Sequence, residues 1–360
     1  MKDKKILTRI KDLRDSIGRP VRLMEVCGTH TVAIFKQGIR DVIPKEISLL
    51  SGPGCPVCVT AIKDVDVAIA IAKMNGNILS TFGDMMRVPG SKQSFFQAQA
   101  EGASIRIVYS PMDALKLALE NKDRKVIFFA TGFETTSPSI AGTLYEAEKA
   151  GAQNFYIYST HKLVPPALKA LLDSGEVRID GLILPGHVCT ITGCTPYEFL
   201  ASDYGVPSVI TGFEGEDILR GIMMLLEQIA ANKPSTEIQY VRAVTKEGNK
   251  KALSILNEYF EPCDANWRGI GVIPQSGLRL KKKYSRWDAT KQFVIEVPET
   301  REPKACQCGL VLRGIKIPTD CPLFGRTCTP ERPVGACMVS SEGSCAAYYK
   351  YGKFASGFKK

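Results

Sequence analysis

The sequence predicts an α/β protein with two related parallel-sheet α/β domains and a C-terminal cysteine-rich domain. Three observations support this prediction. A short apolar run, a polar turn that contains glycine and an amphipathic segment recur as a unit through about residue 230. The tetrapeptide Thr-Gly-Phe-Glu occurs at residues 131–134 and again at 211–214, each time after an apolar run. Residues 306–345 contain six of the twelve cysteines.

The recurring unit is typical of a strand, a loop and a helix. In an open parallel sheet the turns lie at the carboxyl ends of the strands, where ligands bind. The expected strands are residues 22–26, 47–50, 78–80, 125–130, 181–184 and 208–210. The repeated tetrapeptide favours two related layers. We therefore expect one α/β domain over residues 1–122, with Cys27, Cys55 and Cys58, and a second over 123–235.

The third expected domain covers residues 236–360. The strand and helix pattern fades near residues 232–235, and the polar, proline-containing stretch at 296–303 is typical of a linker. The cysteine-rich segment that follows has many glycines and prolines and little periodicity. Such a segment needs something other than a large hydrophobic core for its stability, and a bound metal cluster meets that need.

Composition and charge narrow the function classes. With 360 residues the chain is long enough for two or three domains of ~100–200 residues. No apolar run approaches the ~20 residues that cross a bilayer, and the charged N-terminus has no leader pattern, so we expect a cytoplasmic protein outside the membrane. The net charge of +10 is scattered, so we expect no nucleic-acid partner, and an acidic protein is an equally good partner for the local basic clusters. Twelve cysteines in a reducing cytosol point to metal ligation or redox chemistry.

The six C-terminal cysteines can be divided into four metal ligands and one pair. One such division takes four as ligands and leaves Cys308 and Cys337 as a dithiol, the ligands being Cys306, Cys321, Cys328 and Cys345. Four thiolates suit either tetrahedral zinc or a cubane iron-sulfur cluster, and spacing alone does not separate the two. Because zinc sites favour pairs of cysteines separated by two to four residues, which this segment lacks, we favour the cluster. Six buried structural thiols are the alternative.

Cys55 and Cys58 form a Cys-Pro-Val-Cys motif after an expected strand. The segment at 59–74 has apolar residues at helical spacing, so both sulfurs are expected near a helix N-terminus. There the backbone N–H groups and the helix dipole favour thiolate, which predicts a lowered pKa for at least one of the two cysteines and makes that cysteine reactive. A metal half-site or two inert thiols are the alternatives.

Cys27 stands in a Cys-Gly-Thr-His sequence. Gly28 allows a tight turn, and His30 is placed to orient or deprotonate the thiol. A single thiolate can be an iron ligand or a nucleophile. The alternative is a buried thiol beside a turn.

Further polar residues lie at the ends of expected strands and together suggest one polar site at the sheet edge. They are Thr29, Asp84, Glu134, His161 and His187, which with His30 include all three histidines. The alternative for each residue is a helix cap or a satisfied turn, which is equally expected for Asp84 and Glu134. Cys189, Cys194 and Cys263 carry no assigned role, and no nucleotide-binding fingerprint is present.

Five strings of the sequence together resemble the HypD family of nickel-iron hydrogenase maturation factors. They occur in order over nearly the whole chain. They are Glu-Val-Cys-Gly-Thr-His-Thr at 25–31, Ser-Gly-Pro-Gly-Cys-Pro-Val-Cys at 51–58, Thr-Phe-Gly-Asp-Met at 81–85, Gly-Phe-Glu-Thr-Thr at 132–136 and Pro-Val-Gly-Ala-Cys-Met-Val-Ser at 333–340.

The resemblance implies a three-domain, redox-active scaffold rather than a conventional turnover enzyme. With a small HypC-type chaperone, such a protein holds the iron on which the Fe(CN)2CO group is assembled. Cyanide comes from a HypE-type donor, and the hydrogenase large subunit is an indirect partner. The implied cofactors are a [4Fe-4S] cluster and an iron that carries CN and CO ligands, with the cluster and dithiols supplying electrons.

The resemblance also implies roles for individual residues. Cys27 matches the iron-binding cysteine, Cys55 and Cys58 match the redox-active pair, and Cys308 and Cys337 match the dithiol beside the cluster. The implied cluster ligands are Cys306, Cys321, Cys328 and Cys345. Two positions depart from the family pattern without touching a matched ligand: Cys189, where serine is usual, and Cys194.

Two other classes of function are consistent with the same residues. One is an iron-sulfur disulfide reductase of a thioredoxin-like partner, in which Cys27 is a bystander and no iron is bound outside the cluster. The other is a zinc-stabilised small-molecule transferase with Cys27 as nucleophile, which would be colourless.

Overall fold

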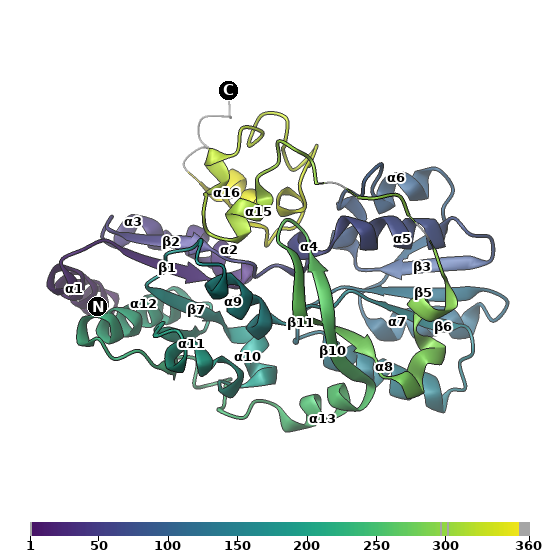
Figure 1. The fold of residues 1–360 in the computed structure, drawn as a ribbon, viewed down its shortest axis with the longest axis horizontal. Coiled ribbons are helices and arrows are strands. Elements are labelled where there is room, and N and C mark those ends of the chain that lie inside the picture. The colour runs from purple at the N-terminus through teal and green to yellow at the C-terminus, as the bar shows by residue number, and fades with distance from the viewer. Residues whose placement is uncertain (1, 296, 301, 353–360) are drawn as a thin grey trace.

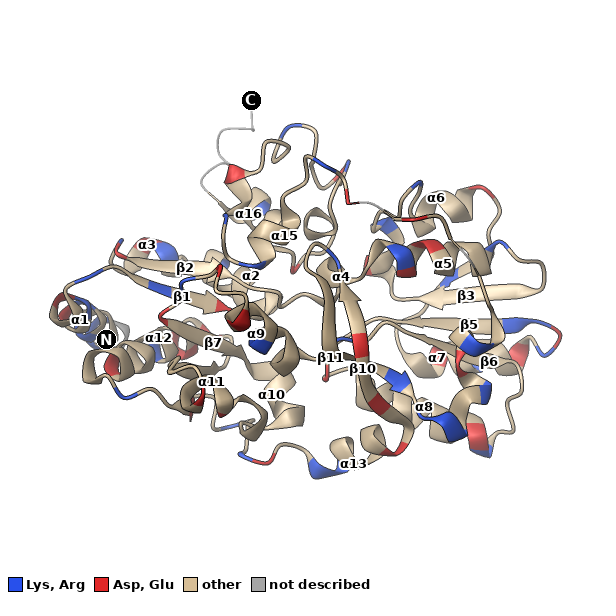
Figure 2. Ribbon diagram, in the orientation of Figure 1, with Lys and Arg blue, Asp and Glu red and all other residues tan. Residues whose placement is uncertain are grey.

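The computed structural model describes residues 2–352 except 296 and 301. Within this range the protein is an α/β protein with two parallel sheets and a C-terminal cysteine-rich region, which confirms the predicted fold class. In Figure 1 the two sheets lie side by side, and the cysteine-rich region, in yellow, sits above the space between them. Lysines and arginines are interspersed with acidic residues over both halves (Figure 2). No described helix is long and apolar enough to span a bilayer.

The first sheet has five parallel strands in the order β2-β1-β7-β8-β9. Its strands are β1 (Val21–Glu25), β2 (Ile47–Ser51), β7 (Gly181–Pro185), β8 (Ser208–Thr211) and β9 (Thr236–Ile238). Alternate residues of β1 enter different cores: Leu23 packs with the apolar sides of α1 (Lys2–Ile17) and α12 (Gly215–Ala231), and Met24 faces the interior of the molecule. Helices on both faces explain why these strands are apolar runs.

The second sheet has four parallel strands in the order β4-β3-β5-β6. Its strands are β3 (Asn77–Thr81), β4 (Ile105–Ile107), β5 (Lys125–Ala130) and β6 (Phe155–Ser159). Helices α7 (Pro111–Glu120) and α8 (Ser137–Lys149) cover one face, whose core includes Phe128. Helices α5 (Ile62–Ala72) and α6 (Phe95–Ala100) lie toward the other face.

The expected boundary between residues 122 and 123 is wrong, because it cuts through the second sheet, where β3 pairs with β5. The chain leaves the first sheet after β2, builds the second, and returns at β7 beside β1. Numbered by their order along the chain, the first four strands of each sheet follow the same order, 2-1-3-4. The two Thr-Gly-Phe-Glu segments follow β5 and β8, the third and the fourth strand of their sheets, so they are not equivalent positions.

The boundary expected at residue 236 is wrong for a related reason. Strand β9 belongs to the first sheet, and residues from 256 to 287 share the core of the second. That stretch contains α13 (Lys250–Tyr259) and an antiparallel hairpin of β10 (Phe260–Trp267) and β11 (Gly271–Leu280). The separate region begins after the expected linker at 296–303, in which residues 296 and 301 lie outside the described part.

The cysteine-rich region has little regular structure, as expected from its composition. It contains α15 (Cys308–Leu312), α16 (Ser344–Tyr351) and two short 3-10 turns, η4 (Pro318–Asp320) and η5 (Ala336–Met338). Helix α16 packs on α2, and η5 packs on α4. The remaining elements are α2 (Gly28–Lys36), α3 (Ile39–Val42), α4 (Pro56–Val59), α9 (Val164–Asp173), α10 (Gly186–Thr192), α11 (Phe199–Ser202), α14 (Ala289–Gln292), η1 (Gly83–Arg87), η2 (Thr195–Tyr197) and η3 (Lys282–Trp287).

Candidate functional site

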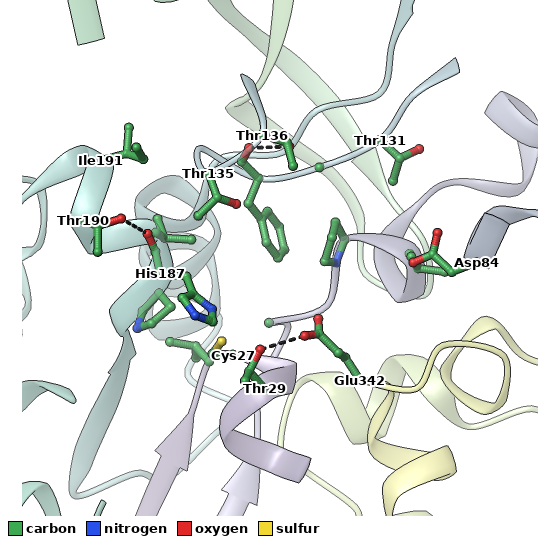
Figure 3. Close-up of a pocket in the computed structure, with 18 of the residues that line it drawn as sticks. Cys27, Thr29, Asp84, Thr131, Thr135, Thr136, His187, Thr190, Ile191 and Glu342 are labelled. Atoms are coloured by element: carbon green, nitrogen blue, oxygen red, sulfur yellow. Dashed lines mark hydrogen bonds between the residues drawn. The ribbon is translucent and has the colours of Figure 1, made fainter. Parts of the chain in front are cut away.

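A cavity of about 470 Å³ lies where the carboxyl ends of the two sheets meet. Its walls are the turns after β1 and β7 of the first sheet and after β3 and β5 of the second, together with residues 54–57 after β2 and Glu342 of the cysteine-rich region (Figure 3). In both sheets these two strands are neighbours at the point where the strand order reverses. Ligands of open α/β sheets bind at such switch points.

Cys27 lies at the floor of this cavity and is the residue before α2. Its side chain is a free thiol with 8% exposure. The two glycines around it are required by close packing: a Cβ on Gly54 would lie 2.2 Å from the Cys27 nitrogen, and one on Gly28 would lie 2.5 Å from the Glu342 carbonyl oxygen. The loop of Cys27, the loop of Cys55 and the cysteine-rich region are therefore held together at this point.

The surroundings of Cys27 keep its proton on the sulfur. Burial, and then the carboxylate of Glu342, raise the pKa of Cys27 to about 12, although the backbone N–H groups of Thr29 and His30 partly offset this. Glu25 lies beneath the loop, where its Oε2 accepts the Cys27 N–H at 3.1 Å, and burial raises its pKa to about 7. A metal ion that binds Cys27 must displace the proton.

His30 is buried but does not act on Cys27 in the expected way. Its Nε2 lies 2.9 Å from both Thr211 Oγ1 and the Gly212 carbonyl oxygen, and no bond between its ring and Cys27 occurs among the described contacts. Burial lowers the pKa of His30 to about 4, so the ring is neutral. The ring of Phe213 lies between two histidines, with centroids 4.5 Å from His30 and 3.9 Å from His187.

The expected polar residues separate into three groups. Thr29, Asp84 and His187 line the cavity, and Glu134 is buried behind its wall. His161 lies away from the cavity, against Phe260 of the β10–β11 hairpin, and burial lowers its pKa to about 3. The structure therefore brings Thr29, Asp84 and His187 together at one cavity and places His161 elsewhere.

Glu134 is a buried carboxyl group that accepts a hydrogen bond from the first residue of α9. Its Oε1 accepts the Val164 N–H at 2.8 Å, and its Oε2 has no partner among the described atoms. Burial raises the pKa of Glu134 to about 7 from 4.5, the value expected in the unfolded chain. Glu214, at the same place in the second Thr-Gly-Phe-Glu segment, is exposed to solvent.

Because the folded state binds this proton more tightly, the free energy of unfolding falls as pH rises from about 4.5 to 7, by up to about 3 kcal/mol. Glu134→Gln keeps the acceptor for Val164 and removes the ionisation, so its stability relative to the wild type increases over that pH range. Urea melts at several pH values measure this, with Glu214→Gln as the matched control. A constant difference between Glu134→Gln and the wild type would contradict it.

The Cys55–Cys58 motif follows strand β2, as expected, but it does not begin the long helix. The chain forms a single turn, α4, and then breaks at Thr60 before α5 begins at Ile62, so the thiols are not at the start of the long helix. Cys58 donates its N–H to Cys55 Sγ at 3.3 Å. Burial, and then the hydrogen bond with Cys337, raise the pKa of Cys58 well above its usual value, so Cys58 does not have the lowered pKa that was expected of at least one cysteine of the pair.

A continuous row of thiols joins this motif to the cysteine-rich region. Cys58 contacts Cys337, and Cys337 also contacts Cys308 and Cys345. Cys308 Sγ lies 3.3 Å from Cys306 Sγ at the other end of the row. Hydrogen bonds from Cys308, Cys345 and Cys58 lower the pKa of Cys337 well below its usual value. The surroundings of Cys337 therefore favour its thiolate form.

The proposed cluster ligands have suitable chemistry but are not gathered around one point. Cys328 Sγ accepts the Val334 N–H at 3.3 Å, and the missing side chain of Gly335 leaves space beside Cys306 and Cys308. Cys321 Sγ lies 3.9 Å from the carbonyl oxygen of Ala305, the residue before Cys306. In the described part of the chain no three His, Cys, Asp or Glu side chains form a ready metal site. Soft thiolates with N–H donors beside them nevertheless fit an iron-sulfur cluster.

Sequence reasoning missed three residues of the site: Glu25, Phe213 and Glu342. Glu25 and Phe213 lie inside strings that had been noted, next to the residues chosen for their chemistry. Glu342 is three positions before Cys345, and nothing in its local sequence indicates that it lies beside Thr29. Of the unassigned cysteines, Cys189 and Cys194 are buried and Cys263 is partly buried.

The fold and the site define a class of protein, an α/β protein with a cavity over a buried cysteine and a row of thiols leading toward it. The family described as "Hydrogenase formation hypA family" (HypD) matches residues 2–352. The chain is 46% identical over 344 residues to hydrogenase maturation factor HypD2 of Bradyrhizobium diazoefficiens, covering 93% of this chain and 90% of the relative. It is 47% identical over 342 residues to hydrogenase maturation factor HypD of Azotobacter vinelandii (93% and 90%), and 45% identical over 359 residues to that of Rhizobium leguminosarum bv. viciae (98% and 93%). The chain therefore belongs to the HypD family of hydrogenase maturation factors.

Proposed function

We propose that this maturation factor acts in the cytoplasm as the scaffold on which the Fe(CN)2CO group of a nickel-iron hydrogenase is assembled. The observation that carries the proposal is the cavity over Cys27, which is closed on one side by the cysteine-rich region. A cavity of about 470 Å³ has room for roughly fifteen waters, at ~30 Å³ each, and thus for an iron ion, its diatomic ligands and part of a partner.

Cys27 supplies the protein's thiolate to the cargo iron. Low-spin iron that carries cyanide and carbon monoxide is well served by soft ligands such as thiolates. A small HypC-type chaperone supplies further ligands, and a HypE-type donor delivers cyanide to the iron within the complex. The hydrogenase large subunit receives the finished group from this assembly.

The thiol row supplies electrons to the cavity. The Cys337 thiolate attacks Cys58 in a Cys55–Cys58 disulfide, and Cys55 leaves as a thiolate. Cys308 then attacks Cys337, which releases Cys58 and leaves a Cys308–Cys337 disulfide. The two electrons have moved from one pair to the other, and each sulfur that reacts touches its partner in the row.

Cys306, Cys321, Cys328 and Cys345 are the residues that would hold a [4Fe-4S] cluster. Once bound, it supplies single electrons that return the Cys308–Cys337 disulfide to the dithiol. The contacts of Cys308 with Cys306 and Cys345 support this assignment, since the pair then adjoins two of the ligands.

A host strain that lacks its own family member tests the proposal. We expect the chain to restore hydrogenase activity there, and we expect the Cys321→Ala chain not to do so. The wild-type protein, purified without oxygen, should be brown, and the Cys321→Ala protein should be pale because a ligand thiolate is missing. Cys263→Ala, which alters a thiol outside the row, is the control and should match the wild type. An active, brown Cys321→Ala protein would remove Cys321 from the ligand set.

A further inference from the structure

The cavity has the opposite charge to the protein as a whole. The chain carries a net charge of +10, yet the charged residues that line the cavity are Asp84 and Glu342, and its lining includes no lysine or arginine. A recess lined by one sign of charge concentrates ions of the opposite sign. The cavity is therefore suited to a cation.

Glu342 is held firmly in this wall although it comes from the cysteine-rich region. Its Oε1 accepts the Thr29 hydroxyl at 2.7 Å (Figure 3). Its backbone is fixed as well, because its carbonyl oxygen packs against Gly28, where a Cβ would lie 2.5 Å away. The carboxylate is thus held against Thr29, which follows Cys27 by two residues in the chain.

A second observation, independent of the acidic residues, also points to a metal cation. The thiol of Cys27 is 92% buried, since its exposure is 8%, and its sulfur faces into the cavity. Cys27, Asp84 and Glu342 all line this cavity, so a cation inside it would face the thiol as well as the two carboxylates (Figure 3).

We propose that Glu342 and Asp84 receive the incoming divalent iron as a hydrated ion and hold it through water beside Cys27. Water-mediated binding accounts for the lack of three ligands around one point among the described residues, and the cavity volume leaves room for it. When the ion passes to Cys27, the S–H bond breaks, an S–Fe bond forms, one bound water leaves and the proton goes to solvent. The inference rests on the proposed function, because it assumes that Cys27 is the thiolate that takes the iron.

Cobalt(II) titration of the full-length protein under anaerobic conditions tests the proposal. Binding at Cys27 is measured as the difference in thiolate-to-cobalt absorption between the wild type and Cys27→Ala. Glu342→Gln retains the acceptor for Thr29 and removes only the charge, so we expect it to weaken this binding about 10- to 100-fold. Salt screens the attraction between the carboxylates and the cation, so the cobalt affinity of the wild type should fall as the salt concentration rises. The cobalt affinity of Glu342→Gln should depend less on salt. Asp84→Asn should behave in the same way.

A matched variant separates this role from a general loss of charge. Glu331→Gln removes an exposed carboxylate of the same region that does not line the cavity, so it should bind cobalt nearly as the wild type does. The proposal is overturned if Glu342→Gln and Asp84→Asn bind with wild-type affinity, or if they bind weakly with an unchanged salt dependence. If Cys27→Ala leaves the whole absorption in place, the proposed function fails instead.

Discussion

Cys27→Ala is expected to reduce hydrogenase maturation to background, at least ~100-fold below the wild type, while the protein stays folded and brown. The thiol is the only sulfur in the lining of the cavity, so no lining residue can replace it as a soft ligand. Loss of one buried sulfur in a tightly packed loop costs about 1 kcal/mol of stability, which a domain of this size tolerates. The thiol row and the C-terminal cysteines lie outside this loop and keep their contacts.

Hydrogenase activity in the deletion strain, together with the visible spectrum of the purified protein, measures this result. Cys27→Ser should retain a trace of iron at most, because oxygen is a harder and poorer ligand for this metal. Full maturation with the alanine variant would show that the iron is held elsewhere and would favour the disulfide reductase function.

Cys337→Ala is expected to stop electron transfer from the cysteine-rich region and to lower maturation about 100-fold or more, because no other thiol of the row touches both Cys58 and Cys308. The brown colour should remain, since Cys337 is not among the proposed ligands. The loss should follow from the thiol itself rather than from packing, so the unfolding midpoint should change little compared with the loss of activity.

A trapped intermediate tests the same step more closely. In a Cys55→Ala, Cys308→Ala double variant, mild oxidation should join Cys58 to Cys337, because both resolving thiols are absent and the two sulfurs are in contact. Peptide mass spectrometry without reduction detects the bond. Cys189 and Cys263 remain in this variant and should stay unlinked, which controls for random oxidation. Absence of the bond would mean that electrons reach Cys55 and Cys58 by another route.

The sequence predicted six of the nine described strands of the parallel sheets because each of the six is an apolar run that ends at a turn containing glycine. Strand β6 was missed because the turn after it, Thr160-His161-Lys162, has no glycine. Strands β4 and β9 were missed because each has three residues at a sheet edge and little burial. Which sheet each strand joins was not predictable from spacing, since β7 returns to β1 across more than a hundred residues.

The sequence identified the cysteines of the candidate site, but it did not predict which of them lie in contact. Cys27 and the two cysteine pairs were singled out by residue type and spacing. The contact between Cys58 and Cys337 depends on packing of η5 against α4, which no local pattern encodes. The raised pKa of Cys58 has the same origin, because burial outweighs the field of a helix that is a single turn long.

Infrared spectroscopy tests the central claim, that Cys27 holds the iron on which the cyanide and carbonyl ligands are assembled. The protein is purified anaerobically with its small chaperone partner from cells that contain the cyanide donor. We expect cyanide and carbonyl stretching bands from the wild-type complex and from Cys263→Ala, and none from Cys27→Ala, although that variant still binds the chaperone and remains brown. Bands of full intensity in the Cys27→Ala complex would contradict the claim.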